Sequence, residues 1–165
     1  MHPSPLNNLD VAVISSPLGA LEILGDKQGI QKITFLDDPT VFSQSIPQSL
    51  QLAVSELKKY FNKETKNFSF KLNPQGTDFQ KRVWLQLAEI PFSKTSSYLD
   101  MAKKLGDVKV IRAAASANGK NPISIVIPCH RVIGSDGSLT GYAGGLWRKK
   151  WLLAHESDVT QGSLF

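Results

Sequence analysis

Cys129 has the clearest potential for chemistry in this chain. It is the only cysteine among 165 residues, and it lies in the segment Pro128-Cys129-His130-Arg131-Val132. A neighbouring base and a permanent positive charge both favour the thiolate over the thiol, and the thiolate is the nucleophilic form. His130 and Arg131 are residues of these two kinds. The segment therefore predicts a nucleophilic cysteine.

The environment of this cysteine allows more than one interpretation. A single cysteine is also among the residue types most often buried as core filler, and alone it can form neither an internal disulfide nor a multi-cysteine zinc site. Adjacent side chains of an extended chain point to opposite sides, so His130 would reach Cys129 through a backbone bend or a bridging water. Glu156, at the end of a helix expected over residues 147–156, could orient the imidazole.

Several predicted elements would position this segment. The β-branched run 123–127 is typical of a buried strand or extended segment, which Pro128 ends. Upstream, Thr77 and Gln80 form a capping box for a helix, and Ser97 and Asp100 form a second one for a helix over residues 98–105. After the Gly106-Asp107 turn, a further helix is expected over about 109–118. The two short helices predict a helix-turn-helix, although an alanine-rich packing helix with a solvated Arg112 is the plainer alternative.

The N-terminal half has the pattern of a small α+β unit without evident chemistry. Short alternating runs separated by turns predict strands over 11–14, 20–24 and 30–35. After Pro47 the apolar spacing predicts a helix, and alternation over 68–72 predicts one more strand. The fold class is therefore α+β: a small N-terminal β-sheet unit with a helix, followed by a mostly helical C-terminal domain containing a helix-turn-helix.

Charge divides the chain near the turn-rich segment 73–76, where we place the domain boundary. Residues 1–76 hold seven Lys/Arg and seven Asp/Glu, whereas residues 77–165 hold twelve and seven, so the second part carries the whole net charge of +5. A polyanion would therefore meet the C-terminal domain. The N-terminus lacks a leader pattern, and no stretch has the roughly 18 apolar residues of a membrane span, so we expect a cytoplasmic protein without membrane contact.

The stretch 79–156 resembles the O6-alkylguanine-DNA alkyltransferases (methylated-DNA–protein-cysteine methyltransferases) of the bacterial type. The matching segments are Ile90-Pro91, Thr95 through Tyr98, Ala102, Leu105-Gly106, Arg112-Ala113, Ala117-Asn118-Gly119, Asn121-Pro122, Ile127 through Val132, Gly141-Tyr142, Gly144-Gly145-Leu146 and Trp151 through Glu156. The segment around Cys129, with its upstream Asn-Pro and downstream Gly-Tyr, is the most specific part. The N-terminal half is similar only in arrangement.

The resemblance implies a role for each matching residue. Cys129 would accept the alkyl group, His130 acting through water and Glu156 would form the relay that makes the thiolate, and Asn121 would be a hinge between recognition helix and active-site segment. Tyr98 would contact the flipped nucleotide and help to protonate the leaving guanine, and Arg112 would fill the gap in the base stack. The active-site strand and the loop lining the guanine pocket would include Arg131, Tyr142, Ala143 and Gly144.

As a whole, the resemblance implies DNA repair by direct damage reversal. The alkyl group would pass irreversibly from O6-alkylguanine in double-stranded DNA, with O4-alkylthymine as a further candidate, to a monomeric protein that reacts once and needs no cofactor. Residues 1–76 would form a ribonuclease H-like supporting domain, and residues 77–165 the DNA-binding and alkyl-acceptor domain. Some relatives hold zinc with N-terminal cysteines, which this chain lacks, so we expect no metal. The alternatives are a protein that recognises alkylated DNA without transfer, and a Cys-His hydrolase or redox thiol.

Overall fold

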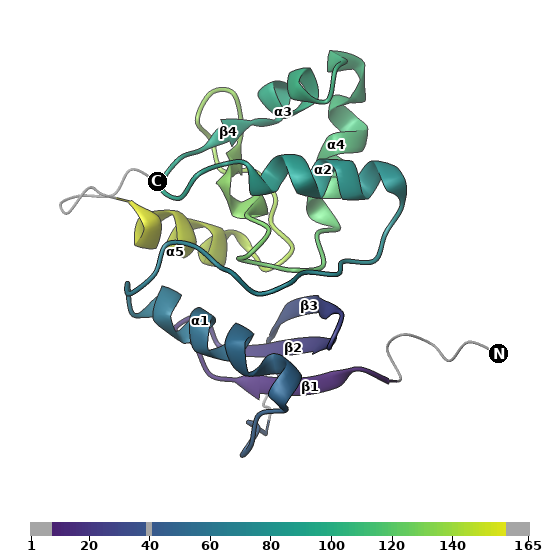
Figure 1. Cartoon of the computed structure of the whole chain (residues 1–165). Coiled ribbons are helices and arrows are strands. Elements are labelled where there is room, and N and C mark those ends of the chain that lie inside the picture. Colours follow the sequence, from purple (N-terminus) through teal and green to yellow (C-terminus); the bar gives the residue numbers. More distant parts are fainter. Residues whose placement is uncertain (1–7, 39–40, 158–165) are drawn as a thin grey trace. The chain divides into compact units, whose positions relative to one another are not determined.

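The computed structural model describes residues 8–38 and 41–157. Its backbone contacts divide the chain into two units, Met1–Gln75 and Gly76–Phe165. The N-terminal unit combines a sheet with a helix, and the C-terminal unit is mostly helical (Figure 1). The expected α+β fold class is confirmed by this arrangement.

The sheet of the N-terminal unit is a three-stranded antiparallel meander. It comprises β1 (Asp10–Ile14), β2 (Ala20–Asp26) and β3 (Gly29–Leu36), in the order β1-β2-β3. Gly29, the first residue of β3 after the tight turn, has φ +134°, a conformation that favours glycine. The three strands predicted from alternation and turn residues are confirmed.

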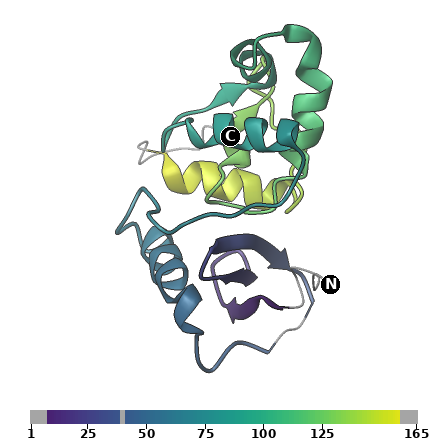
Figure 2. The ribbon, with the colours of Figure 1, turned by 45° about the vertical axis from the view of Figure 1, so that its right-hand side comes forward.

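Helix α1 (Gln51–Phe61) follows a 3₁₀ turn, η2 (Gln48–Leu50), and lies along the sheet in both ribbon views (Figures 1 and 2). Its buried residues are Ala53, Val54, Leu57 and Tyr60, which form one apolar face as the sequence predicted. The strand predicted over 68–72 is wrong. In the described part of this segment only Leu72 forms an isolated bridge, with Ile30. Ile30 donates its N–H to the carbonyl of Lys71 and accepts the N–H of Asn73, and these two bonds make up the bridge.

The C-terminal unit begins with α2 (Asp78–Ala88), whose predicted capping box is confirmed. Thr77 accepts a hydrogen bond from the N–H of Gln80, and the Gln80 side chain accepts one from the N–H of Thr77. The buried Trp84 donates its indole N–H to the carbonyl of Ala117 at 2.9 Å. This bond fixes α2 against the helix that carries Ala117.

Two further helices form the helix-turn-helix. They are α3 (Tyr98–Lys104) and α4 (Ile111–Gly119), and Gly106 between them has φ +103°. The second helix was expected to begin near Lys109, but a 3₁₀ turn, η3 (Val108–Val110), comes first. Asp107 explains this start, since its side chain accepts the N–H of Lys109 and caps the tighter turn.

The segment before Cys129 is not the strand that its composition predicted. Residues 123–127 fold into a compact turn, in which the N–H of Ile127 donates to the carbonyl of Ile123 at 3.0 Å and Ile125 has φ +75°. Cys129–Arg131 forms a 3₁₀ turn, η4, and leads into β5 (Val132–Ile133), which pairs in parallel with β4 (Ser96–Ser97). Cys129 therefore lies in a sharp bend of the backbone.

The last element is α5 (Leu146–Glu156), which contacts η4 and thereby supports the cysteine segment. Its buried residues include three charged ones, Arg148, Lys149 and Glu156, beside Leu152 and Leu153. Within residues 8–38 and 41–157, no helix has the length and apolar character needed to cross a bilayer.

Candidate active site

A cavity of about 310 Å³ in the C-terminal unit contains the cysteine. Its walls come from α3, α4, the turn before Cys129 and the loop before α5. The lining residues are Tyr98, Ala115, Asn118, Gly119, Asn121, Ser124, Cys129, Gly141, Tyr142 and Ala143. The volume lies within the range of small-molecule sites in proteins. A molecule in this cavity would therefore be surrounded by a thiol, two amides and two phenols.

Asn121 holds the cysteine and the preceding turn together with its side-chain amide. One N–H of Nδ2 donates to the carbonyl of Ile127 at 2.7 Å, and the other donates to Sγ of Cys129 at 3.1 Å. Oδ1 accepts the N–H of Ile123 at 2.9 Å. All the hydrogen-bonding groups at the end of the side chain are thus engaged except one lone pair of Oδ1, which fixes the amide orientation.

The resting cysteine is held as a thiol rather than a thiolate. Cys129 is 6% exposed, and its burial raises the pKa of the thiol above the ordinary value. The hydrogen bond from Asn121 and the positive charge of Lys149 act in the opposite direction on this pKa. Formation of a thiolate therefore requires a base to remove the proton.

His130 and Arg131, which were expected to favour the thiolate directly, instead bind Glu156. Nε2 of His130 lies 2.8 Å from Oε2 of Glu156, and Nε of Arg131 donates to Oε1 at 2.7 Å. Nη1 of Arg131 also donates to the carbonyl of Ile90 at 2.7 Å. The positive charge of Arg131 is thus compensated by a buried carboxylate.

Burial and these contacts set the protonation states of the pair. Burial lowers the pKa of His130, although the charge and hydrogen bond of Glu156 oppose this shift, so the imidazole is neutral near pH 7. Burial opposes the ionisation of Glu156, but His130 and Arg131 outweigh it and hold the pKa of Glu156 well below its ordinary value. The neutral imidazole therefore donates its Nε2–H to the Glu156 carboxylate, which leaves Nδ1 as an acceptor.

Nδ1 of His130 is buried, and among the described residues it has no hydrogen-bond partner. This nitrogen belongs to the residue that follows Cys129 in the chain. An unpaired acceptor of this kind is a base that can take a proton without first breaking a hydrogen bond.

Stability should fall as the pH decreases through the range in which histidine titrates. The pKa of His130 is lowered in the folded protein, so below about pH 6.5 the unfolded chain binds a proton that the folded protein does not. We expect the free energy of unfolding to be smaller at pH 5.5 than at pH 7.5, by at most about 1.4 kcal/mol per pH unit. Urea unfolding at the two pH values measures this difference.

His155 provides the matched control, because it stacks on Trp151 and is not buried like His130. His130→Gln should remove most of the difference between the two pH values, and His155→Gln should leave it unchanged. A difference that persists in His130→Gln would mean that another group titrates in this range.

The other predicted site residues lie at four kinds of position. Tyr98, Tyr142 and Ala143 line the cavity together with Cys129 and Asn121. The carbonyl of Gly144 accepts a hydrogen bond from Nη1 of Arg148 at 3.0 Å, which holds the loop that follows Ala143. Arg112 is exposed on α4, the helix that contributes Ala115, Asn118 and Gly119 to the cavity wall. Arg131 is not among the lining residues, since Glu156 and Ile90 bind its guanidinium.

Lys149 is a site residue that the sequence interpretation missed. Its side chain is fully buried, and Nζ donates to the carbonyls of Val132 and Thr140, both at 2.7 Å, and of Gly141 at 3.4 Å. Burial lowers the pKa of Lys149 to about 8. The sequence feature that could have revealed Lys149 is the helical spacing of Lys149, Leu152 and Glu156. This spacing places all three residues on one face of α5.

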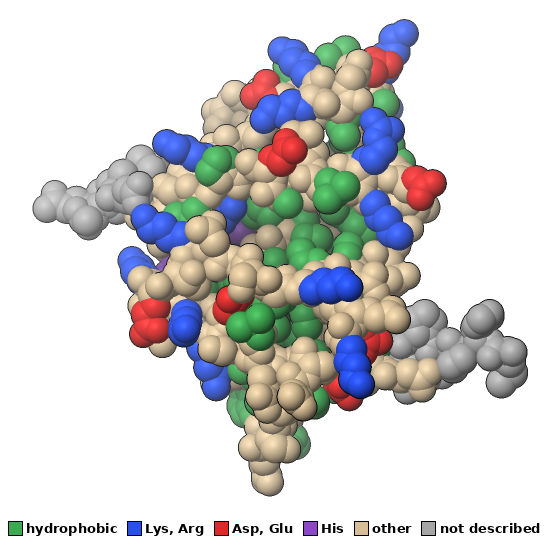
Figure 3. Space-filling view, in the orientation of Figure 1, with side chains coloured by type: hydrophobic (Ala, Val, Ile, Leu, Met, Phe, Trp, Pro, Cys, Tyr) green, Lys and Arg blue, Asp and Glu red, His purple; other side chains and the backbone are tan. Residues whose placement is uncertain are grey.

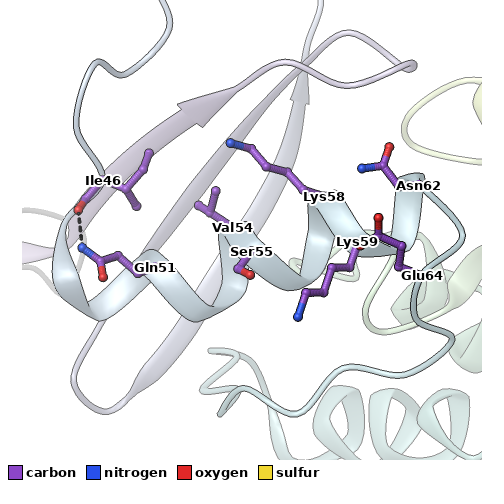
Figure 4. Close-up of a pocket in the computed structure, with 8 residues that line it drawn as sticks. All are labelled: Ile46, Gln51, Val54, Ser55, Lys58, Lys59, Asn62 and Glu64. Atoms are coloured by element: carbon purple, nitrogen blue, oxygen red, sulfur yellow. Dashed lines mark hydrogen bonds between the residues drawn. The ribbon is translucent and has the colours of Figure 1, made fainter.

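A second pocket, of about 380 Å³, lies in the N-terminal unit (Figure 4). Its lining residues are Ile46, Gln51, Val54, Ser55, Lys58, Lys59, Asn62 and Glu64. Most of them are exposed, and the labelled side chains include no thiol or imidazole. The potential for nucleophilic chemistry therefore belongs to the cavity beside Cys129.

The basic residues do not form one continuous patch on the face of the molecule shown in Figure 3. Lys and Arg side chains lie there singly or in small groups, with Asp and Glu side chains between them. The excess positive charge of residues 77–165 is thus a property of composition rather than of this face.

The geometry can be compared with known proteins. Residues 10–74 match the family described as "6-O-methylguanine DNA methyltransferase, ribonuclease-like domain", and residues 78–158 match "6-O-methylguanine DNA methyltransferase, DNA binding domain". The methylated-DNA–protein-cysteine methyltransferase of Methanosarcina acetivorans is 42% identical over 154 residues, which are 89% of this chain and 97% of that protein.

Solved structures show the same fold. The structure of the Mycobacterium tuberculosis O6-methylguanine methyltransferase matches with a TM-score of 0.81 and 38% identity, over 94% of this chain and 97% of that one. The structure of Mycobacterium tuberculosis OGT in complex with DNA matches with a TM-score of 0.80 and 41% identity, over 88% and 92% of the two chains.

Proposed function

The chain belongs to the O6-methylguanine DNA methyltransferase family, and we propose that Cys129 accepts the alkyl group from O6 of a guanine in double-stranded DNA. The protein thus repairs DNA by moving a methyl group onto one of its own cysteines. One observation carries the assignment: the only cysteine of the sequence lines a cavity of about 310 Å³. A protein-cysteine methyltransferase with one cysteine has one candidate acceptor.

His130 is the base that activates the thiol in this proposal. A water molecule between the Cys129 thiol and Nδ1 would pass the proton from sulfur to imidazole, since Nδ1 has no hydrogen-bond partner among the described residues. The imidazolium that forms would be stabilised by Glu156, which already binds Nε2 at 2.8 Å. Asn121 and Lys149 would stabilise the thiolate, because both lower the pKa of Cys129.

The transfer itself is a displacement at the alkyl carbon. The thiolate forms a carbon–sulfur bond while the bond from that carbon to O6 breaks and its electron pair stays on the guanine. The guanine leaves more easily when it takes up a proton, which the phenol of Tyr98 in the cavity wall would help to supply. The product is a stable thioether, so each molecule reacts once and needs no cofactor.

The position of the cavity on α4 supports extrusion of the damaged nucleotide. A sulfur atom inside a protein cannot reach O6 within an intact base stack, so the nucleotide must rotate out of the duplex. Arg112 lies three residues before Ala115, which belongs to the cavity wall. The two residues therefore share one face of α4 and are about 4.5 Å apart along the helix axis. As an exposed cation on the helix that lines the cavity, Arg112 would enter the gap that the extruded nucleotide leaves in the stack.

Arg112→Ala should therefore slow repair of duplex DNA much more than reaction with the free base. We expect the rate on duplex O6-methylguanine to fall roughly tenfold or more, because the extruded state loses the stabilisation that Arg112 provides. Such a fall corresponds to a loss of about 1–3 kcal/mol. Reaction with free O6-methylguanine base should hardly change, since no stack needs to be filled. Single-turnover rates on both substrates measure the two effects.

Lys59→Ala is the matched control, because Lys59 is an exposed cation of the N-terminal unit. It should leave both rates near those of the unsubstituted protein. Equal losses of Arg112→Ala on duplex and free base would contradict the role in extrusion.

The division of labour between the domains is part of the same proposal. Residues 77–165 would bind DNA and accept the alkyl group, because they hold the cavity and the excess of basic residues. Residues 1–76 would support the fold, and the protein would act as a monomer. Incubation with duplexes carrying a radiolabelled methyl on O6 of guanine or O4 of thymine tests the substrate range: label on the protein supports transfer. Binding without label would favour recognition of the lesion alone.

A further inference from the structure

Lys149 carries a charge deep inside the C-terminal unit. Its side chain is fully buried on α5, on the same face as Leu152 and Leu153. Within the described residues, no carboxylate forms an ion pair with its ammonium. A buried charge without such a partner costs folding free energy unless hydrogen bonds compensate for it. The groups that bind the ammonium therefore explain why a lysine is tolerated here.

Three backbone carbonyls bind the ammonium of Lys149, and they belong to two segments of the site. The carbonyl of Val132 lies in β5, the strand that follows the cysteine turn, and accepts at 2.7 Å. The carbonyls of Thr140 and Gly141 accept at 2.7 and 3.4 Å. Gly141 lines the cavity, as does the next residue, Tyr142. One ammonium group thus joins α5, the strand after the cysteine and one wall of the cavity.

The protonated form of Lys149 is needed to hold this wall. Residues 138–142 form neither helix nor strand, so no regular ladder of backbone hydrogen bonds fixes them. A protonated lysine has three N–H donors, and the three carbonyls use all of them. The neutral amine has two donors, and a methionine of similar length has none. The hold on the loop therefore depends on the proton that Lys149 carries.

The charge of Lys149 also interacts with the groups around it. Burial lowers the pKa of Lys149 to about 8, and the charge of Cys129 in η4 opposes this shift. In turn, the positive charge of Lys149 is one of the causes that lower the pKa of His130. The other charged or titratable residues of the elements that meet here are Arg131 of η4, Arg148, Lys150, His155 and Glu156 of α5, and Tyr142 of the loop. Near pH 8 the ammonium therefore begins to lose the proton on which its hold depends.

We propose that Lys149 is a positioning residue, whose ammonium holds the loop wall of the cavity in place relative to Cys129. This inference rests on the proposed transfer and extends it by naming the group that keeps an extruded base aligned with the sulfur. Displacement at carbon is sensitive to this alignment, and a misplacement of about 1 Å can slow a reaction by about a hundredfold. The positioning effect is separate from the influence of the charge on the thiolate, which acts whether or not a base is bound.

The test compares duplex DNA carrying O6-methylguanine with iodoacetamide, a small reagent that alkylates a thiolate without needing a bound base. The measured quantity is the ratio of the two second-order rates at Cys129, in which any change in the amount of thiolate cancels. In Lys149→Met, which removes the ammonium at similar length, this ratio should fall by about tenfold or more. In Lys149→Arg, whose guanidinium also donates to carbonyls, part of the ratio should return.

Lys150→Met is the matched control, because Lys150 is the next residue of α5 and is exposed. Its ratio should equal that of the unsubstituted protein. If the ratio is unchanged in Lys149→Met, the lysine acts on the thiolate alone or not at all, and the inference is overturned. Failure of the proposed function is a different result, in which iodoacetamide alkylates Cys129 of the unsubstituted protein but the duplex transfers nothing to it.

A pH profile of the same ratio tests the inference without a substitution, and it decides the question if Lys149→Met does not fold. Because Lys149 loses its proton near pH 8, the ratio for the unsubstituted protein should be lower at pH 9 than at pH 7, by up to about tenfold. In Lys149→Arg the ratio should stay constant over this range, since the guanidinium remains charged. A ratio that does not change with pH in the unsubstituted protein would overturn the inference.

Discussion

Replacing Cys129 with alanine is expected to abolish alkyl transfer completely and to leave binding to alkylated DNA unchanged. The chain contains no second cysteine that could take over the reaction. The substitution removes only a sulfur atom from a site held by the backbone of η4, so the fold should persist. The two properties are measured on the same variant: transfer by the labelled methyl group that appears on the protein band of a gel, and DNA binding by titration.

Cys129→Ser completes this experiment as the conservative variant. The serine hydroxyl can still accept the hydrogen bond from Asn121, but its proton is far less acidic than that of a thiol, so transfer should remain undetectable. Transfer that survives in either variant would assign the reaction to another residue. Loss of DNA binding together with transfer would show a damaged fold instead of a missing nucleophile.

Replacing Glu156 with glutamine is expected to reduce both stability and transfer. Glu156 is 2% exposed and is bound by His130 and by two nitrogens of the buried Arg131. The amide leaves the charge of Arg131 uncompensated in the interior, which usually costs about 3–5 kcal/mol. It also withdraws the negative charge that would stabilise the imidazolium of His130, so transfer should slow by about a hundredfold or more. Urea unfolding and single-turnover transfer measure the two losses.

A double variant distinguishes the two effects. Adding Arg131→Gln to Glu156→Gln removes the unpaired buried charge, so part of the lost stability should return. Transfer should remain slow, because His130 still lacks a carboxylate. Glu89→Gln serves as the control, since Glu89 is exposed at the end of α2 and its replacement should change stability by less than about 0.5 kcal/mol. If transfer recovered along with stability, Glu156 would be structural rather than part of the relay.

Much of the fold could be predicted from the sequence because local signals there agree with the packing. The alternation and turn residues of 11–35 predict β1, β2 and β3, and the capping box at Thr77 predicts the start of α2. The strand prediction for residues 123–127 was wrong because a tertiary contact outweighs the local preference. The β-branched residues favour a strand, but the amide of Asn121 binds both ends of the segment and stabilises a turn in which Ile125 has φ +75°.

The types of residue in the site could be predicted from the sequence, but most of their contacts with one another could not. The segment around Cys129 indicates the nucleophile and its neighbouring base, yet sequence neighbours need not interact: His130 and Arg131 both bind Glu156, 26 and 25 positions further along. Lys149 was missed because a buried lysine is rare, and only its three carbonyl partners explain it.

The most direct test of transfer to Cys129 is the intact mass of the protein, with peptide mapping, after reaction with duplex DNA bearing one O6-methylguanine. We predict a gain of one net CH₂ group, localised to the peptide that contains Cys129 and saturating at one per molecule. Such a result would establish the reaction, the acceptor and the stoichiometry together. An unchanged mass of protein that still binds this DNA would contradict the account and leave recognition without transfer.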